Sequence, residues 1–597
     1  MSLNPAPMTR KAWWILLAAL AGFTGLVYLP VLDNGLVWDD WANIARNPHY
    51  KGIGPEQLRW AFATFRLGHY QPLAWISLGL DHALWGDDYR GYHFTNVVLH
   101  AVNAFLFGLI ALRLLGTTRT STGAAGRRRL AAVGSLVAAA TFALHPLRVE
   151  SVAWLSERRQ LVSAVFFLLA VLVYLRGFED EARPRPTGLA LASVTALYGL
   201  SLLAMPLGIA LPVVLLVLDA YPLRRAPSGA GVAGWLRPLV EKTPLFALAA
   251  AFAVSALAAQ RASGALLSIE RYDFWQRSAQ AAYGTLFYPR ALFAVSWSPL
   301  YERPFNLDPL EARFVLSALG SVVVTGLLIL YRRAFPAGLA VWLVYLALLV
   351  PISGLAQSGI QLVADRYSYL SGLGFALLLG MGAAIGWRAC SGPAARALWS
   401  VGLAALLGLW SWASWNQQAV WRDDVSFWNH VLRRGPSALA HTSLGSIALR
   451  QGDPASAGEH MTSALEIAPT YGRAWRKMLE VLDVDRHGLD TSELERIVVA
   501  LEGGIEYHSD TAIAWYVLGL ARARLGETDR AASDFERAVA IQPDHARAWL
   551  RLGVARLASS RPDAAIQALE RAVELDPAGP EARTWLDLAR KRAATTP

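Results

Sequence analysis

The first 415 residues contain a succession of long apolar segments separated by short polar connections. About twenty apolar residues in a helix cross the core of a bilayer, and a chain in lipid must satisfy its backbone polar groups internally. The pattern therefore predicts a bundle of about eleven membrane-spanning helices. The predicted spans are Trp13–Leu32, Tyr92–Leu115, Leu130–Leu144, Leu161–Leu175, Gly188–Ala204, Leu207–Tyr221, Pro244–Ala259, Phe314–Tyr331, Leu339–Ile352, Tyr367–Trp387 and Leu398–Trp415.

Composition and charge support a membrane protein. Of the 597 residues, 54% are hydrophobic and only 17% are charged, which is too apolar for one soluble domain. The basic residues behind the net charge of +10 gather in short loops between apolar segments, as the positive-inside rule predicts, so we exclude nucleic acid as a partner. The single cysteine, Cys390, excludes an intrachain disulfide and a multi-cysteine metal site.

The basic residues also predict the orientation of the chain. Arg10 and Lys11 precede the first span and place the N-terminus in the cytoplasm, and an odd number of spans then places the C-terminal region outside. Residues 274–297 are apolar but interrupted by charges and a proline, and we interpret them as an interfacial or re-entrant helix. The basic residues expected in cytoplasmic loops are Arg113, Arg119, Arg127, Arg128, Arg129, Arg176, Arg183, Arg185, Arg224, Arg225, Arg237, Lys242, Arg332, Arg333, Arg388 and Arg396.

A repeat replaces the apolar pattern in the C-terminal region. Leu-Gly pairs recur there, each followed by alanines and a proline at matching offsets, and their glycines are Gly445, Gly519 and Gly553. The last two lie 34 residues apart, the tetratricopeptide period, and the longer first interval leaves room for one lengthened repeat near Trp475. The sequence thus predicts an all-α protein: a polytopic membrane bundle, residues 1–415, followed by a soluble tetratricopeptide-repeat α-solenoid, residues 416–597. Its concave surface would bind a peptide, or the stack would serve packing or oligomerisation.

Two adjacent carboxylates, Asp39 and Asp40, follow the first span. They begin a long outer loop, residues 33–91, which contains two amphipathic, tryptophan-rich pieces, Pro55–Phe65 and Tyr70–Trp85. A carboxylate at this level can take a proton from an acceptor hydroxyl, and its neighbour can raise its pKa or share a divalent metal ion. The alternative is a solvated Asp pair in a turn. We predict that Asp39 and Asp40 are catalytic and leave a metal ion open.

Three arginines are the predicted phosphate ligands. Arg158 and Arg159 end a short outer loop whose positive charge runs against the usual bias, and Arg366 reaches the same membrane face. Guanidinium groups bind phosphate oxygens through paired N–H groups. The alternative is internal pairing with Glu150 and Glu157 in the same loop.

Further polar residues near this face are the predicted lining of a substrate pocket: His93, His145, Glu150, Asp365 and Tyr367. Polar side chains at membrane depth are costly unless they are paired or functional. Histidines on a span are often hydrogen-bonded core residues, so that alternative stays open for His93.

Several stretches of the chain together carry a resemblance to a known family. They are Asp39-Asp40, Asn47-Pro48, Arg59-Trp60-Ala61-Phe62, Pro72-Leu73-Ala74-Trp75, His93-Phe94-Thr95-Asn96, His145–Arg159, Ala364–Leu370 and the region from Trp421 into the repeats. With these stretches the chain resembles the bacterial relatives of the transmembrane and tetratricopeptide-repeat (TMTC) O-mannosyltransferases. The resemblance covers nearly the whole chain and implies membership of the GT-C glycosyltransferases, which use polyprenyl-phosphate sugars and carry a catalytic acidic residue in the first outer loop. Met205 and Gln71 depart from frequent family residues and leave the donor sugar open.

The resemblance implies an inverting transferase in the bacterial inner membrane, with its repeats in the periplasm. It would move mannose or another hexose from a polyprenyl phosphate to Ser or Thr hydroxyls of a protein acceptor, which the repeats would hold. An O-oligosaccharide ligase or polymerase is the nearest alternative, but that group relies on a large late outer loop, whereas the large loop comes first here. A non-catalytic scaffold acting through the repeats is the second alternative. A transporter is the third, and the lack of visible inverted repeats argues against it.

Overall fold

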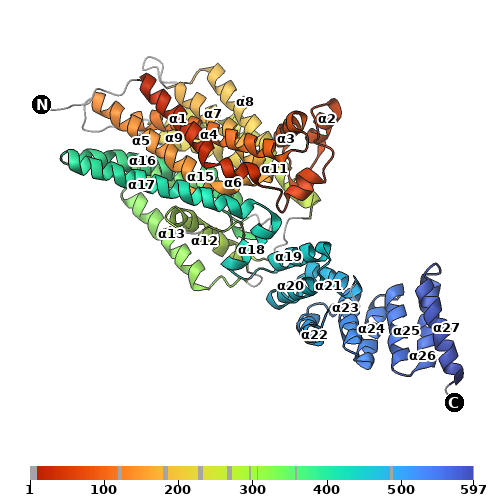
Figure 1. The fold of residues 1–597 in the computed structure, drawn as a ribbon. Coiled ribbons are helices and arrows are strands. Elements are labelled where there is room, and N and C mark those ends of the chain that lie inside the picture. The colour runs from red at the N-terminus through yellow and green to blue at the C-terminus, as the bar shows by residue number, and fades with distance from the viewer. Residues whose placement is uncertain are drawn as a thin grey trace. The chain divides into compact units, whose positions relative to one another are not determined.

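The structure, a computed structural model, is almost entirely helical, as the sequence predicts (Figure 1). It describes residues 10–117, 124–178, 186–225, 231, 233–264, 272–294, 297–304, 307–355, 360–484 and 489–595. Arg119, Arg183 and Arg185, expected in cytoplasmic loops, lie outside these residues. The chain forms two compact units, Met1–Phe427 and Trp428–Pro597. The domain limit drawn from the sequence, between residues 415 and 416, lies slightly earlier.

All eleven apolar segments are helical in the first unit. Among the described residues, six helices have the length and hydropathy to cross a membrane on their own. They are α1 (Arg10–Val27) with the short η1 (Leu29–Asp33), α4 (Tyr89–Gly116), α7 (Arg158–Arg176), α11 (Thr243–Ala262), α13 (Ala312–Leu330) and α17 (Pro393–Gln417). Three shorter apolar helices match predicted spans as well: α8 (Gly188–Ala204), η6 (Pro206–Ala210) with α9 (Leu211–Ala220), and α14 (Pro336–Leu349) with η7 (Val350–Ile352).

The other two apolar segments are bent. One bends by 58° between α5 (Ala124–Leu144) and the turns η4 (Pro146–Arg148) and α6 (Val149–Ala153). The other bends by 66° between η8 (Asp365–Tyr367) with α15 (Ser368–Ser371) and α16 (Leu373–Ala389). Pro146 cannot continue the hydrogen-bond ladder of α5, which accounts for the first bend.

A crossing of two small residues brings these bent segments together. Gly134 of α5 and Gly380 of α16 approach so closely that a Cβ atom on Gly380 would collide with the carbonyl oxygen of Gly134. Small residues permit such close contact between membrane helices. Beyond the crossing, the bent ends meet as well, where Nη2 of Arg148 donates to Oγ of Ser368 at 2.8 Å. This packing carries the segments 145–157 and 365–371 to one place.

The long first loop folds into a small helical layer. It contains one π-turn, η2 (Trp41–Ala45), then α2 (Pro55–Ala63), η3 (Arg66–Gly68) and α3 (Pro72–Trp85), and α2 and α3 match the predicted amphipathic pieces. Its core joins Tyr50, Trp75 and Leu78 to Leu155. All residues of 145–157 are buried, whereas the sequence predicted a short outer loop there. The difference arises because the first loop packs over this segment.

The remaining parts of the first unit connect these elements. The segment predicted as an interfacial or re-entrant helix forms α12 (Phe274–Ala291), begun by a capping box of Asp273 and Gln276. It is not among the described helices with the length and hydropathy of a span. A two-stranded antiparallel sheet of β1 (Tyr301–Glu302) and β2 (Gln361–Val363) leads into η8. The short α10 (Ala233–Glu241) precedes α11, and η9 (Gln418–Trp421) follows α17.

The second unit is a stack of helical hairpins reached through α18 (Asp424–Arg434). The hairpins pair α19 (Ala438–Gln451) with α20 (Pro454–Ile467), α21 (Gly472–Val484) with α22 (Thr491–Ile505), α23 (Ala512–Arg524) with α24 (Thr528–Ile541), and α25 (Ala546–Ala558) with α26 (Pro562–Leu575). The final helix, α27 (Pro580–Thr595), matches the predicted cap, and the second hairpin is the predicted lengthened repeat. The glycines of the Leu-Gly pairs lie where the two helices of a hairpin touch, since a Cβ atom on Gly519 would lie 2.7 Å from the ring of Phe535.

Candidate active site

The two predicted catalytic carboxylates occupy different environments. Asp40 is fully buried, and its Oδ1 accepts hydrogen bonds from the backbone N–H and the hydroxyl of Ser156, at 2.8 and 2.6 Å. Its Oδ2 accepts one from the backbone N–H of Val37 at 3.3 Å. Asp39, on the same turn, is only half-buried. Asp39 is therefore the member of the pair that a substrate can reach, while Asp40 joins the first loop to Ser156.

Burial sets the acid–base behaviour of Asp40. Removal from water raises the pKa of its carboxyl to about 7, although the hydrogen bonds from Ser156 and Val37 lower it, and the nearby charge of Asp39 adds a smaller increase. All three of these hydrogen bonds are donated to Asp40, so they favour its ionised form. The carboxyl thus changes charge in the physiological pH range.

A second group of charges surrounds Arg366. Its Nη1 donates to Oε1 of Glu150, and its backbone N–H donates to Oε2 of the same carboxylate at 2.8 Å. Oε1 of Glu157 lies 3.5 Å from Nε of Arg366 and accepts a hydrogen bond from Nη2 of Arg159 at 2.8 Å. Both glutamates are buried. Two buried acids and two arginines therefore form one ion-pair network.

Two atoms of this network have unused hydrogen-bonding capacity. Among the described residues, neither Nε of Arg159 nor Oε2 of Glu157 has a hydrogen-bond partner, although both atoms are buried. Buried polar atoms are nearly always paired, so an unpaired donor and an unpaired acceptor in one network indicate a position for a ligand or a water molecule. The side chain of Arg159 keeps 12% of its surface exposed.

The turn η5 (Leu155–Glu157) connects Asp40 to this network. Ser156 holds Asp40, and the next residue, Glu157, holds Arg159 and Arg366. Three segments far apart in the sequence thus converge: the first loop, residues 154–159 and η8.

Trp154 fills the space between these segments. Its ring stacks on that of Trp38, with centroids 5.2 Å apart and planes 2° apart, and the guanidinium of Arg366 lies 5.3 Å from its centroid. The aromatic ring thus separates the turn before Asp39 from the arginine network. Such a ring also stabilises the cation through its π-face.

His69 approaches the same network from the first loop. Desolvation and the positive charges of Arg159 and Arg366 lower the pKa of this imidazole well below its ordinary value. His69 is therefore neutral near pH 7, and it does not add to the positive charge of the two arginines.

Arg158, the third predicted phosphate ligand, belongs to a separate structural network. It is fully buried and forms an ion pair with Asp81 at 2.6 Å. Its remaining N–H groups donate to Oδ1 of Asn96, Oγ of Ser77 and the carbonyl oxygen of Tyr92. The structure thus places Arg158 between α3, α4 and α7, with its donors occupied by the protein.

The other predicted pocket residues divide in the same way. Asp365 accepts a hydrogen bond from the hydroxyl of Tyr301 at 3.1 Å, and the ring centroid of Tyr367 lies 5.0 Å from the guanidinium of Arg366. Both therefore adjoin the arginine network, as Glu150 does. His145 instead caps η4 and contacts the carbonyl oxygen of Leu292, and His93 is fully buried on α4. Among the described residues, no hydrogen bond or ring contact joins either histidine to Arg366 or Asp40.

Sequence reasoning did not select Ser156 or Glu157 as site residues. Ser156 and Glu157 follow Trp154 within the motif that supplied the arginines, and Glu157 entered only as an alternative ion-pair partner. A signal was available, because two glutamates among three arginines in a buried loop predict some internal pairing. Nothing in the local sequence indicates which oxygen is left unpaired.

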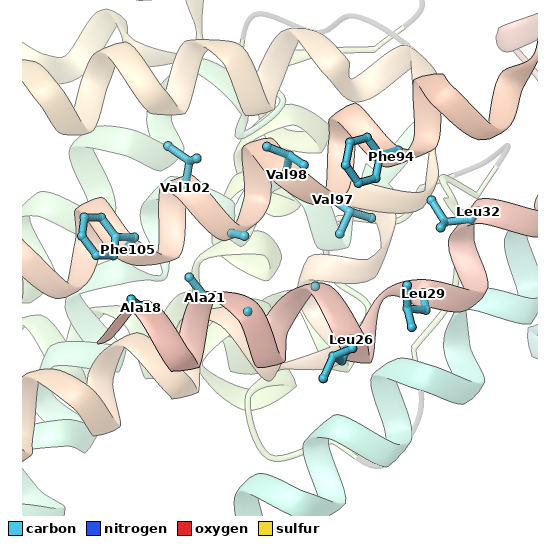
Figure 2. Close-up of a pocket in the computed structure, with 13 residues that line it drawn as sticks. Ala18, Ala21, Leu26, Leu29, Leu32, Phe94, Val97, Val98, Val102 and Phe105 are labelled. Atoms are coloured by element: carbon cyan, nitrogen blue, oxygen red, sulfur yellow. The ribbon is translucent and has the colours of Figure 1, made fainter. Parts of the chain in front are cut away.

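An apolar groove about 510 Å³ in volume runs between α1 and α4 (Figure 2). Figure 2 shows Ala18, Ala21 and Leu26 of α1 opposite Val98 and Val102 of α4. One end of the groove is formed by Leu32 and Phe94. Leu32 immediately precedes the loop that carries Asp39, so the groove leads from the membrane region to the start of that loop.

Among the described residues, no group of three or more His, Cys, Asp or Glu side chains is placed to hold a metal ion. Glu150, Glu157 and Asp40 are engaged by arginines and by Ser156. The divalent metal ion that the sequence left open stays a prediction.

Comparison with known proteins identifies the repeats and a partial likeness to curated proteins. The tetratricopeptide repeat family matches residues 428–471, 500–544 and 516–580, so the second unit contains tetratricopeptide repeats. Among curated proteins, protein O-mannosyl-transferase Tmtc1 of Drosophila melanogaster is 36% identical over 171 residues, which are 27% of this chain and 18% of that protein.

Two further relatives show the same extent of likeness. Human protein O-mannosyl-transferase TMTC4 is 31% identical over 159 residues, covering 25% of this chain and 21% of that protein. The Drosophila melanogaster Tmtc2 protein is 30% identical over 216 residues, covering 34% of this chain and 21% of that protein. The matched part thus spans about a fifth of the length of these relatives.

Solved structures that match part of the chain include the MamA protein and a thermophilic tetratricopeptide-repeat protein of Thermus thermophilus. MamA is 21% identical with a TM-score of 0.22 and covers 26% of this chain and 82% of its own. The Thermus thermophilus protein is 20% identical with a TM-score of 0.22 and covers 32% of this chain and 98% of its own.

Proposed function

We propose that this protein is a membrane glycosyltransferase that moves a sugar from a polyprenyl-phosphate donor to Ser or Thr hydroxyls of a protein acceptor. One observation carries the proposal. The accessible Asp39 lies on the same turn as Asp40, which Ser156 binds, and Ser156 is followed by Glu157, whose network with Arg159 contains unpaired atoms. The likeness to protein O-mannosyl-transferases supports mannose or another hexose as the sugar.

The chemistry is a single displacement with inversion. Asp39 takes the proton of the acceptor hydroxyl while the oxygen of that hydroxyl attacks C1 of the sugar, and the bond between C1 and the phosphate oxygen breaks. The electron pair of that bond leaves with the polyprenyl phosphate. In this proposal, Nε of Arg159 donates a hydrogen bond to the leaving phosphate. Arg366, which contacts Glu157, stabilises the negative charge of the phosphate from a longer distance.

The unpaired oxygen of Glu157 has a complementary role. It accepts a hydrogen bond from a hydroxyl of the donor sugar, which places the sugar next to the phosphate bound by Arg159. Asp40 acts as a positioning residue, because its hydrogen bonds fix Ser156 and so the turn that bears Glu157. We route no step through a metal ion, and assays with and without a chelator test that choice.

The lipid nature of the donor fits the surroundings of the site. A polyprenyl chain is apolar along its length, and the groove between α1 and α4 offers an apolar surface that ends beside the first loop. In this proposal, the N-terminus lies in the cytoplasm of a bacterial cell, and the first loop and the repeats face the periplasm. Cysteines introduced at Asp87 and at Gly503 in a chain lacking Cys390 would react with an impermeant reagent from outside.

The decisive test is sugar transfer by Asp39→Asn in membrane preparations, with a polyprenyl-phosphate mannose and a Ser/Thr-containing peptide. Loss of the general base should lower the rate about a hundredfold or more. The matched control is Asp87→Asn, which removes an exposed carboxylate of the same loop that pairs with Lys51 at 2.7 Å. It should retain activity, since exposed ion pairs contribute little.

Two results would contradict the proposal. Full activity in Asp39→Asn would remove Asp39 from the mechanism, and transfer from a nucleotide sugar but not from the lipid donor would exclude the proposed donor. A non-catalytic scaffold predicts a third pattern, in which the wild-type chain transfers no sugar and only loss of the repeats impairs the cell envelope.

A further inference from the structure

The turn that carries Asp39 and Asp40 has an unusual backbone. Trp38, immediately before the pair, has a φ of +51°, in the left-handed region that bulky side chains rarely adopt. Such a conformation is unfavourable by itself and persists only where surrounding contacts hold it. The contacts around Trp38 therefore indicate what fixes the position of Asp39.

Those contacts come from Asp424, at the start of α18. Its Oδ1 accepts a hydrogen bond from the backbone N–H of Trp38 at 2.8 Å, and its Oδ2 accepts one from Nε1 of Trp41 at 2.8 Å. One carboxylate thus binds the residue before the Asp pair and the residue after it. Both hydrogen bonds are charge-assisted, which makes them about twice as strong as neutral ones.

Neighbouring contacts hold Asp424 itself in register. The backbone N–H of Gly35 donates to the carbonyl oxygen of Arg422 at 2.8 Å, and Nδ2 of Asn34 donates to that of Gln418 at 3.1 Å. The side chain of Gln418 is fully buried and bonds to Val31 and Val27. The segment 418–424 is therefore hydrogen-bonded to several residues at the beginning of the first loop and just before it.

An aromatic cluster completes this arrangement. Trp421 stacks on Trp154 with centroids 5.8 Å apart, and Trp154 stacks on Trp38. Phe427 lies 5.1 Å from Trp421 and 5.8 Å from Trp38. These rings determine where Trp38 can lie, and Asp424 determines its backbone conformation.

We infer that Asp424 is a positioning residue for the transfer reaction: it holds the Trp38–Trp41 turn in the conformation that presents Asp39 to the acceptor hydroxyl. The inference rests on the proposed function for the reaction, but the structural part of it can be tested without activity. Asp424 contacts neither donor nor acceptor in this scheme. Its loss should therefore lower kcat and leave KM for both substrates nearly unchanged.

The variant is Asp424→Asn in the full chain. An asparagine can still accept from Trp38, but its amide N–H groups then face the indole N–H of Trp41, so the turn loses one of its two bonds. Misplacement of a catalytic group by about 1 Å can cost a hundredfold in rate, so we expect kcat to fall about ten- to a hundredfold. Trp41→Phe removes the indole N–H that would oppose the amide of the asparagine. Adding Asp424→Asn to Trp41→Phe should therefore lower kcat much less than Asp424→Asn does in the wild type.

The matched control is the neighbouring carboxylate, Asp423. It accepts from the backbone N–H of Ser426 at 2.7 Å, at the start of α18. Asp423→Asn removes the same charge one residue away and leaves the Trp38 turn untouched, so it should retain the wild-type kcat. Asparagine caps helices as well as aspartate does, so α18 should also be preserved.

Hydrogen–deuterium exchange provides the readout that is independent of activity. Asp424→Asn should speed exchange of amides within residues 36–43, while α4 and α7 keep wild-type protection, and Asp423→Asn should change neither. Unchanged exchange in residues 36–43, or an equal fall in kcat for both variants, would overturn the inference. Faster local exchange in a chain that transfers no sugar in any form would instead refute the proposed function and leave the role of Asp424 in the turn established.

Discussion

The repeat unit and the active-site region are held together over very different distances along the chain. In the repeats, close contacts join the two helices of one hairpin, as Gly519 does with Phe535, or helices of neighbouring hairpins, as Arg524 does with Leu482, 42 residues away. At the site, Asp40 bonds to Ser156, 116 residues away, and Trp38 bonds to Asp424, 386 residues away. The repeats are thus built from neighbouring pieces, and the site exists only when the whole membrane unit is in place.

This difference predicts that a single buried contact matters most in the membrane unit. Arg158→Ala would leave the carboxylate of Asp81 buried without its cation, and breaking a buried ion pair costs roughly 3–5 kcal/mol. We expect a large fall in the thermal unfolding temperature of the detergent-solubilised protein. Arg90→Ala, which breaks an exposed pair with Asp33, is the control and should have little effect. Equal stability of the two variants would contradict the structural role of Arg158.

The next largest effect should come from the titration of Asp40. Its pKa is raised from 3.8 to about 7 in the folded chain, so the native state holds the proton more tightly than the unfolded state. The resulting stabilisation is present below pH 3.8 and is lost as the pH rises through 7, which amounts to about 2–3 kcal/mol between pH 5 and 7.

Asp40→Asn tests this linkage, because it should remove most of the decrease in unfolding temperature between pH 5 and 7. Transfer activity of the wild type should run the opposite way and rise towards pH 8, since the ionised carboxylate receives the hydrogen bonds from Ser156 and Val37. A wild-type stability that is flat from pH 5 to 8 would show that Asp40 does not titrate in this range.

A smaller and more local effect is expected in the repeats. Gly519→Ala would force a methyl group against the ring of Phe535, and overpacking of this kind typically costs roughly 1–3 kcal/mol. Gly503→Ala is the matched control, because Gly503 is an exposed glycine of α22 with open space around its Cα, and alanine there should stabilise by about 0.5–1 kcal/mol. Limited proteolysis should show faster cleavage of residues 428–597 only in Gly519→Ala.

The smallest effect is expected at the surface of the same unit. Arg571 and Glu574 form an exposed pair at 2.7 Å on α26, and Glu574→Gln should change stability by no more than about 0.5 kcal/mol. Thermal unfolding at low and high salt should therefore coincide for this variant and the wild type. A large loss would mean that the repeats depend on surface charge and not on hairpin packing.

The repeats and the apolar helices could be predicted from sequence because each produces a regular pattern among residues that are close together in the chain. The period of the Leu-Gly pairs located the hairpins, and long apolar segments located the spans. The site was harder, as Arg158 and Arg159 show. Adjacent residues at the start of a helix point about 100° apart, so one enters the network of Asp81 and the other that of Glu157. Nothing in the sequence distinguishes the two.

The buried position of residues 145–157 could not be predicted for a related reason. Their composition fits a short outer loop, and they are covered by the core of the first loop, which includes Trp75, and by distant residues such as Leu292 and Trp421. That packing joins residues that are far apart in the chain, and no sequence pattern links them. Asp39 and Asp40 have the same local sequence context, and their different exposure also follows from partners far away.

The pairing of the first loop with residues 418–424 has a consequence for biosynthesis. A ribosome delivers Asp39 and Asp40 to the membrane long before Asp424 has been made, so the turn around them must wait for the last transmembrane helix. The chain therefore cannot finish its site while it is still being inserted. Any truncation before Asp424 should yield a membrane protein whose earliest-made carboxylates never reach their final arrangement.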